Sequence, residues 1–410
     1  MKLLVCPLIY MRRAQFKRRF QNQKCQQAFR NNSPSEDFQM NRIGVMQITD
    51  SLAIGGLERV AVNLANGLPS EHFHSHLCVT RDTGPLENLL GKNVKRMELK
   101  RSGRYDLGAI WRLRKYIRDN QIQILHAHGT SLFIAAIVSG FRPKPVVVWH
   151  DHFGRCDTEQ RSASSYKSAA KKLGGVIAVN QNLADWSRSE LRVPKDRVWY
   201  VPNFVHETAS VEKIPELPGK KGSRIVCVAN LRPQKDHLNL FHAMRIVARA
   251  IPEAHLILVG NGDDKNHLAA LNELLSAQRL GASVTWLGAR TDVGAILRGC
   301  DLAVLSSVSE GLPLALIEYG LAGLPTVSTN VGQCAEVLDG GRAGILVPPA
   351  SPVALADAII SFLKSPEKRS VFGGEFSQRV RQNYSSEVIL RKICKVYETV
   401  LSKSPAMKSA

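Results

Sequence analysis

The chain has few cysteines for its length, and none of them stands in a pattern with a structural use. Its 410 residues include eight cysteines, with no C-x-x-C pair and no Cys/His cluster. A disulfide framework or a structural zinc site needs such spacing. We therefore expect reduced core thiols, no bound metal and a cytoplasmic location.

Long apolar runs are missing as well. No stretch approaches the roughly 20 apolar residues that span a bilayer as a helix. The N-terminal run from Leu3 to Tyr10 is short and is interrupted by Pro7. Most positive charges follow this run, the reverse of the order in a signal peptide. The sequence predicts a soluble protein, or one peripheral at the cytoplasmic face of a membrane.

Negative charge is scarce, mainly in the first half. The formal net charge is +20, and residues 1–205 hold 32 Lys and Arg against 16 Asp and Glu. Such an excess favours an anionic partner, either a membrane surface or a pyrophosphate-bearing substrate, although a solvated basic surface explains it equally well. No basic stretch is interleaved with aromatic residues, and no nucleic-acid-binding motif is present, so we expect no nucleic acid partner.

Short apolar segments alternate with helical periodicity over most of the chain. This pattern predicts α/β architecture with parallel sheets covered by helices on both faces. We expect two Rossmann-like domains facing each other across a cleft, with ligands at the carboxyl ends of the strands. The predicted strands are Ile43–Ile48, His76–Thr80, Ile122–His126, Val146–Trp149, Val176–Val179 and Val198–Val201, then Ile225–Ala229, His255–Val259, Val284–Leu287, Leu302–Leu305 and Pro325–Ser328.

Changes in composition divide the chain. Residues 1–40 are basic and rich in Gln and Asn, which favours a disordered extension or translated sequence upstream of a start at Met40 over a basic membrane-surface helix, because the apolar residues there are few. The first domain is expected at 41–205, a proline-marked linker at 206–222 and the second domain at 223–384. A C-terminal helix at 385–402 is expected to pack back on the first domain, followed by a tail at 403–410.

The segment from Glu310 to Glu318 carries the sharpest functional signal. It follows an apolar strand, and Pro313 suits the first turn of a helix. The start of such a helix offers free N–H groups and partial positive charge to a phosphate. A carboxylate beside a phosphate would repel it, so the two Glu side chains on either side of this site are expected to face hydroxyl groups of the same ligand. The pattern therefore indicates a nucleotide sugar.

This Glu-x7-Glu spacing resembles the motif of the retaining family-4 glycosyltransferases, the group 1 glycosyl transferases of GT-B fold. The resemblance covers about residues 42–400. It implies that Glu310 meets the donor sugar, that Glu318 holds the ribose, and that Lys235 and Arg232 bind the diphosphate. Arg232 stands two positions later than the usual Arg, so Lys235 is the closer match. His128, in His126-Ala-His128, corresponds to a histidine near the reacting centre.

The resemblance implies further donor and acceptor contacts. A glycine loop at Gly55 and Gly56 closes over the donor phosphates, and the remaining expected donor contacts are Asn203, Gly260, Gly288, Ser307, Gly311, Leu312 and Leu314. Glu58 and His150 are expected on the acceptor side. The family works without a metal or a cofactor, with the nucleotide diphosphate sugar as co-substrate.

The resemblance implies a transfer of hexose from a nucleotide sugar, most commonly a UDP-sugar, to an acceptor hydroxyl. The acceptor is expected to be a glycan or a lipid-pyrophosphate-linked glycan in polysaccharide or lipopolysaccharide biosynthesis. Two alternatives stay open. One is a nucleotide-sugar epimerase on the same fold, and the other is a non-catalytic nucleotide-sugar-binding subunit that supports another transferase.

Overall fold

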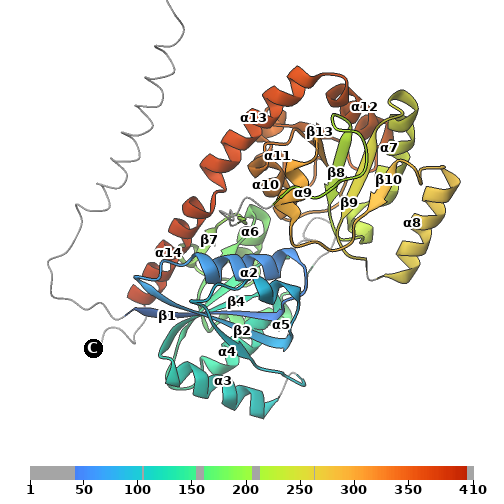
Figure 1. The fold of residues 1–410 in the computed structure, drawn as a ribbon. Coiled ribbons are helices and arrows are strands. Elements are labelled where there is room, and N and C mark those ends of the chain that lie inside the picture. Colours follow the sequence, from blue (N-terminus) through green and yellow to red (C-terminus); the bar gives the residue numbers. More distant parts are fainter. Residues whose placement is uncertain (1–41, 104–105, 154–160, 206–212, 263, 404–410) are drawn as a thin grey trace, which may run out of the picture. The chain divides into compact units, whose positions relative to one another are not determined.

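The computed structural model describes residues 42–103, 106–153, 161–205, 213–262 and 264–403. The described residues from Arg42 onward belong to one compact unit that contains two parallel sheets (Figure 1). The predicted basic extension at 1–40, most of the tail and the first part of the predicted linker lie outside the described residues. In the described parts of the chain, no helix combines the length and the apolar character needed to cross a bilayer.

The first sheet has seven strands in the order β3-β2-β1-β4-β5-β6-β7. All of its pairings are parallel, as the alternating pattern predicts. Its strands are β1 (Ile43–Ser51), β2 (Phe73–Asp82), β3 (Lys95–Glu98), β4 (Ile122–His128), β5 (Val146–Asp151), β6 (Leu173–Ala178) and β7 (Val198–Tyr200).

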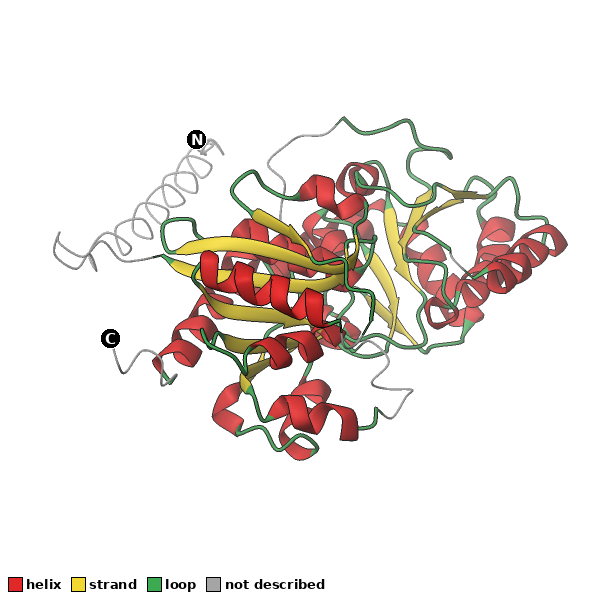
Figure 2. Cartoon of the chain, turned by 90° about the horizontal axis from the view of Figure 1, so that it is seen from below, coloured by secondary structure: helices red, strands yellow, loops and turns green. Residues whose placement is uncertain are grey.

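Helices cover both faces of this sheet because its strands are apolar on both sides (Figure 2). On one face the core is filled by α3 (Leu107–Asp119), α4 (Leu132–Val138), α5 (Ser164–Ala170) and α6 (Gln181–Ser189). On the other face it is filled by α2 (Gly56–Gly67) and by α14 (Ser386–Ser402), the last helix of the described chain. Residues from the two ends of the described chain therefore share one core.

The second sheet has six parallel strands in the order β10-β9-β8-β11-β12-β13. These are β8 (Arg224–Val228), β9 (His255–Val259), β10 (Val284–Trp286), β11 (Leu302–Leu305), β12 (Thr326–Thr329) and β13 (Ile345–Val347). The helices of this part are α7 (His237–Ala250), α8 (Lys265–Ala277), α9 (Val293–Arg298), α10 (Leu314–Leu321), α11 (Cys334–Val337), α12 (Pro352–Leu363) and α13 (Pro366–Asn383). Short 3-10 turns lie at Pro85–Leu89, Gly129–Ser131, Lys195–Arg197, Pro233–Lys235 and Asp339–Gly341.

The structure adds two strands that the apolar pattern did not predict, β3 and β13, one at an edge of each sheet. Strand β3 has the sequence Lys-Arg-Met-Glu and is held by backbone pairing with β2, so it carries no apolar signature. Pro313 also differs from the prediction. It is the residue before α10, with ψ of 122°, and the helix begins at Leu314.

Candidate active site

Two loops at the carboxyl edge of the six-stranded sheet bring Lys235 and Glu310 together. Lys235 Nζ lies 2.5 Å from Glu310 Oε1, and Ser307 Oγ donates a hydrogen bond of 2.6 Å to the same oxygen. Glu310 is only 6% exposed. A buried carboxylate needs a charged partner and hydrogen-bond donors, and it has both here. The carboxylate is thus fixed in position.

The backbone holds these two loops against each other. Ser306 Oγ donates to the carbonyl of Lys235, and the N–H of Val308 donates to the carbonyl of Gln234. Gly332 closes the other side with φ of 50°, and a Cβ at this position would lie 2.1 Å from the carbonyl oxygen of Glu310. Only glycine combines that conformation with so close an approach.

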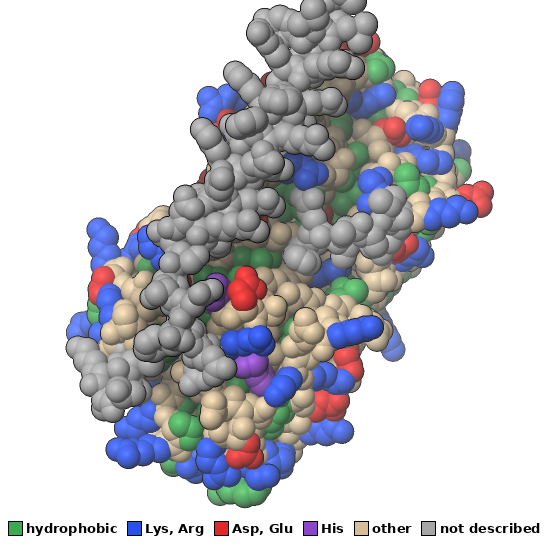
Figure 3. Space-filling view, turned by 60° about the vertical axis from the view of Figure 1, so that its left-hand side comes forward, with side chains coloured by type: hydrophobic (Ala, Val, Ile, Leu, Met, Phe, Trp, Pro, Cys, Tyr) green, Lys and Arg blue, Asp and Glu red, His purple; other side chains and the backbone are tan. Residues whose placement is uncertain are grey.

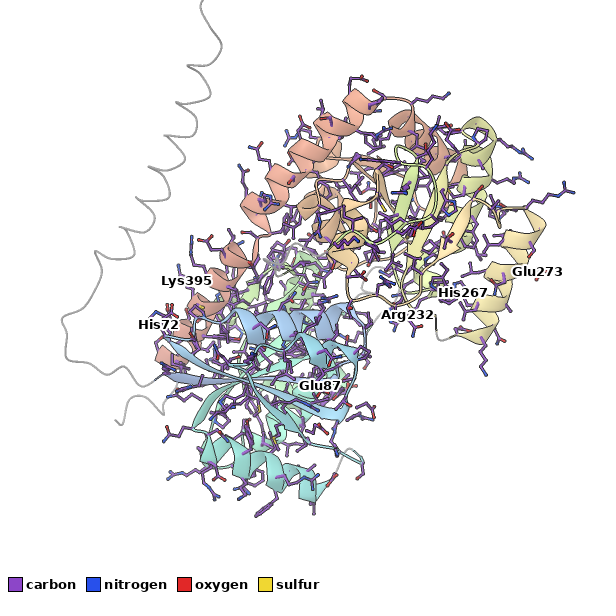
Figure 4. All side chains as sticks on the ribbon, viewed as in Figure 1. His72, Glu87, Arg232, His267, Glu273 and Lys395 are labelled. Carbon is purple, nitrogen blue, oxygen red and sulfur yellow. The ribbon has the colours of Figure 1, made fainter. Side chains whose placement is uncertain are left out.

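Asp236 ends the loop from β8 and begins α7. It adopts left-handed φ of 49° and caps the helix by accepting a hydrogen bond from the N–H of Asn239. Lys235 immediately precedes this cap and lies next to Glu310. Arg232, from the same loop, is exposed at the edge of the sheet (Figure 4).

The helix α10 contributes its N-terminus and Glu318. Leu314 and Ala315 occupy its first turn, where backbone N–H groups have no acceptor within the helix. Glu318 lies about one turn further along. Burial raises the pKa of the Glu318 carboxyl above its ordinary value, and the charge of Arg59 on α2 opposes this shift.

The glycine loop before α2 approaches these residues from the first domain. A Cβ at Gly56 would lie 3.8 Å from Leu314 Cδ1, and Asn230 Nδ2 donates to the carbonyl of Ile54 over 3.2 Å. Glu58 folds back over the start of α2, so that a Cβ at Gly55 would lie 2.3 Å from its Oε2. Burial raises the pKa of Glu58, while Arg232 lowers it. The structure thus groups the loop with Arg232, Leu314 and Glu318.

The other predicted donor residues lie on two sides of this group. Asn203 Nδ2 donates to the carbonyl of Leu312 over 2.9 Å, next to the buried Gly311, and the buried Asn203 Oδ1 has no partner among the described residues. Gly260 donates its N–H to the carbonyl of Gly288 over 2.9 Å. A Cβ at Gly260 would lie 2.1 Å from the carbonyl oxygen of Ala229, where the loop that carries Lys235 begins, so Gly260 lies beside that loop and Gly288 lies one strand further along the same edge.

His128 and His150 belong to a separate cluster at the carboxyl ends of β4 and β5. We define the histidine cluster as His126, His128, His150 and His152. His126 bonds His150 and His128 bonds His152, each over 3.1 Å. Two further residues bond to the cluster. Gln47 Oε1 lies 2.9 Å from His128 Nε2, and the hydroxyl of Tyr397 on α14 bonds both His126 and Gln47.

One set of neutral tautomers, assigned from the bonding pattern, accounts for every bond of this network and leaves only the buried His150 Nε2 without a partner among the described residues. His128 Nε2–H donates to Gln47 Oε1, which leaves His128 Nδ1 to accept from His152. Gln47 Nε2 donates to Tyr397, whose hydroxyl then donates to His126 Nδ1. Both ring nitrogens of His128 are therefore engaged within the protein.

Burial lowers the pKa of every histidine in the cluster, for His126 and His152 to about 3. Nitrogens of His126, His128 and His150 lie within 4.8 Å of one another, a donor set that suits zinc. The rings of His126 and His128, however, are parallel within 3° with centroids 4.7 Å apart. A metal lies in the plane of each imidazole it binds, so these stacked rings do not converge on one ion. The nitrogens bond one another instead.

The sequence did not single out four residues of this region: Gln47, His126, His152 and Tyr397. The two histidines stand in the same pairs as His128 and His150, and the strand-end pattern could have found them. His152 is partly exposed, whereas His128 and His150 are buried. Tyr397 lies 350 residues from Gln47, and no local pattern connects them.

Two protein-family models match the chain. The model for Glycosyltransferase Family 4 matches residues 54–208, and the model for Glycosyl transferases group 1 matches residues 222–365. Phosphatidyl-myo-inositol mannosyltransferase of Mycobacterium leprae is 26% identical over 314 residues, which covers 73% of this chain and 79% of that protein. UDP-Gal:alpha-D-GlcNAc-diphosphoundecaprenol alpha-1,3-galactosyltransferase of Escherichia coli is 26% identical over 300 residues, or 68% of this chain and 77% of that protein.

Solved structures show the same fold. Anabaena Alr3699/HepE, in complex with UDP and glucose, has a TM-score of 0.72 at 18% identity and covers 87% of this chain and 100% of that one. Sucrose-phosphate synthase from Thermosynechococcus elongatus has a TM-score of 0.72 at 18% identity, with 88% and 100% covered. These likenesses confirm the predicted GT-B fold.

Proposed function

The chain belongs to the family-4 glycosyltransferases, the group 1 glycosyl transferases, and from this premise we propose that it transfers a hexose from a UDP-sugar to an acceptor hydroxyl with retention of configuration. The observation that carries the proposal is the Lys235–Glu310 pair, held in a closed loop cradle beside the N-terminus of α10. This arrangement joins fixed positive charge to a carboxylate within one small volume.

The positive groups suit the leaving diphosphate. In this transfer the bond between the anomeric carbon and the phosphate oxygen breaks, and negative charge builds on the nucleotide diphosphate. The acceptor oxygen would bond to the same carbon on the same face, and the leaving phosphate would take the proton of the acceptor hydroxyl. Lys235, Arg232 and the free N–H groups at the start of α10 would stabilise that charge, the role of a divalent cation in other enzymes. At about 4 Å and an effective dielectric near 20, each charge pair contributes roughly 4 kcal/mol before desolvation. The proposed reaction therefore uses neither metal nor cofactor.

The carboxylates suit the sugar ends of the donor. Glu310 would orient the hexose, and its charge would stabilise positive character at the anomeric carbon. Glu318 would accept hydrogen bonds from the ribose, with the glycine loop at Gly55 and Gly56 over the diphosphate. We propose that His128, whose ring is fixed by its bond to His152, would position the sugar or the acceptor.

The acceptor is proposed to be a lipid-linked glycan of polysaccharide or lipopolysaccharide biosynthesis. The Escherichia coli relative carries a diphosphoundecaprenol-linked sugar in its name, and the mycobacterial relative carries a phosphatidylinositol. The basic first half of this chain suits such an anionic, membrane-held acceptor at the cytoplasmic face.

A screen of nucleotide sugars by thermal unfolding tests the proposal. A ligand at 100 times its dissociation constant stabilises the folded protein by about 2.7 kcal/mol. We expect stabilisation by a UDP-sugar, and slow release of UDP from that donor without acceptor. If no nucleotide sugar stabilises the protein or is consumed, the proposed function is wrong.

A further inference from the structure

The first domain exposes large apolar side chains in only one place among the described residues. Leu107 is 77% exposed and Trp111 is 63% exposed, both on α3, and Phe141 is 44% exposed directly after α4 and its turn. Arg114 of α3 lies over the ring of Phe141, 4.2 Å from its centroid. All three apolar side chains therefore gather around one helix.

Helical geometry puts Leu107 and Trp111 on one line. They are four residues apart, whereas the core contacts of α3 come from Ala109, Leu113 and Ile117 on the opposite side. The exposed pair has no covering element in the described chain. Isolated exposed apolar residues are ordinary, but an exposed tryptophan beside a leucine on one helix face is a docking feature.

Cations surround these residues. We define the α3 face as Leu107, Trp111 and Phe141 together with Arg112, Arg114, Lys115, Arg118, Arg142 and Lys144. One carboxylate, Asp119, pairs with Lys115 and Arg118 there, and Asp106 is used as the N-cap of the helix. The face keeps a clear positive excess. Figure 3 shows many Lys and Arg side chains, with apolar ones among them, over the lower part of that view.

We propose that the α3 face docks on an anionic lipid bilayer, with Trp111 and Leu107 in the headgroup layer and the surrounding cations on lipid phosphates. An amphipathic indole and long cationic side chains that reach to the interface suit this surface. A protein partner would need acidic side chains placed opposite each of these cations. An anionic bilayer presents negative charge over its whole surface.

The position of α3 connects this surface to the active site. The helix follows β3, so its first turn, with Leu107, lies at the carboxyl edge of the sheet, where β1 and β4 also end. Arg101, in the loop just before α3, bonds Asp50 at the end of β1. A bilayer against Leu107 would lie beside the edge that holds His128. This inference rests on the proposed function for the lipid-linked acceptor only; the docking surface itself does not depend on it.

Vesicle co-sedimentation of the full chain tests the proposal. The probes are vesicles of phosphatidylcholine alone and of phosphatidylcholine mixed with phosphatidylglycerol. We expect binding to the mixed vesicles that weakens with salt. The variant L107S/W111S should lose roughly tenfold or more of this affinity, because it removes the two apolar side chains that would enter the bilayer. The variant K115Q/R118Q should bind more weakly and with less dependence on salt.

Matched controls keep the result specific. Val353→Ser with Val371→Ser removes two exposed apolar side chains from the second domain, and Arg249→Gln removes an exposed cation there. These variants should bind as the unmodified chain does. The α3 variants should keep its melting temperature, because the changed side chains make no core contacts.

Two outcomes would overturn the proposal. If L107S/W111S sediments with anionic vesicles as well as the unmodified chain does, another segment binds the membrane. If light scattering shows that this variant abolishes a dimer and vesicles bind neither protein, the face is an interface between copies. Failure of the proposed function has a different signature: nucleotide sugars would not stabilise the unmodified protein, while the α3 variants would still lose vesicle binding.

Discussion

Replacing Lys235 with alanine separates its two roles, in the reaction and in the resting protein. In the reaction it would face the leaving diphosphate, and removing one such charge-stabilising group costs about 3–4 kcal/mol of barrier, or two to three orders of magnitude in turnover. In the resting protein it neutralises Glu310. Breaking a buried pair costs about 3–5 kcal/mol, and the lower end applies because the Lys235 side chain is 19% exposed.

The assay is UDP release under saturating donor, measured together with thermal unfolding. We expect K235A to fold with a lower melting temperature and to turn over about 100- to 1000-fold more slowly. The double variant Lys235→Met with Glu310→Gln removes both charges. It should regain much of the lost stability, because no carboxylate is left unpaired, and it should remain inactive. A turnover of K235A near that of the unmodified enzyme would refute the diphosphate role and leave Lys235 as a structural partner only.

Three further predictions concern the surrounding structure. Gly332→Ala should lower stability by more than about 2 kcal/mol and abolish donor-induced stabilisation, because its φ of 50° and its 2.1 Å approach to Glu310 exclude a Cβ. Gly374→Ala, in open space within α13, should leave donor-induced stabilisation unchanged and raise stability by up to about 1 kcal/mol. Tyr397→Phe should cost about 1–3 kcal/mol in denaturant unfolding, because the buried Gln47 and His126 lose their shared partner; an unchanged midpoint would contradict the network. Stability should fall as the pH drops from about 6.5 toward about 3, by up to about 1.4 kcal/mol per pH unit for each histidine of the cluster, since the unfolded chain binds protons that the folded one excludes. A His126→Gln variant with the same pH slope would count against this reasoning.

Much of the fold could be predicted because the strands of a parallel sheet covered on both faces are short apolar runs, which are visible in the sequence. Strands β9 and β11 have the predicted bounds. Strand β3, with the sequence Lys-Arg-Met-Glu, was missed because only its pairing with β2 creates it, and no local pattern reports such pairing. Strand β13 was missed because its apolar run, Ile345–Val347, has only three residues.

The candidate site, too, could be predicted from the sequence only in part. The loop with Lys235 and the segment with Glu310 each follow a predicted strand, so the rule that parallel strands end at one edge brings them together. The histidine cluster needs Gln47 from β1 and Tyr397 from α14, and only tertiary packing places these side chains beside β4. The back-folded Glu58 is likewise a matter of side-chain geometry that spacing does not reveal.

The central claim is that the Lys235–Glu310 cradle holds a nucleotide sugar for transfer. The most direct test is UDP release from a panel of UDP-sugars by the unmodified chain and by K235A, with melting temperatures measured in the same samples. The account predicts that at least one UDP-sugar both stabilises the unmodified chain and is consumed, and that K235A consumes it about 100-fold or more slowly. Equal consumption by both proteins, or none by the unmodified chain, would contradict it.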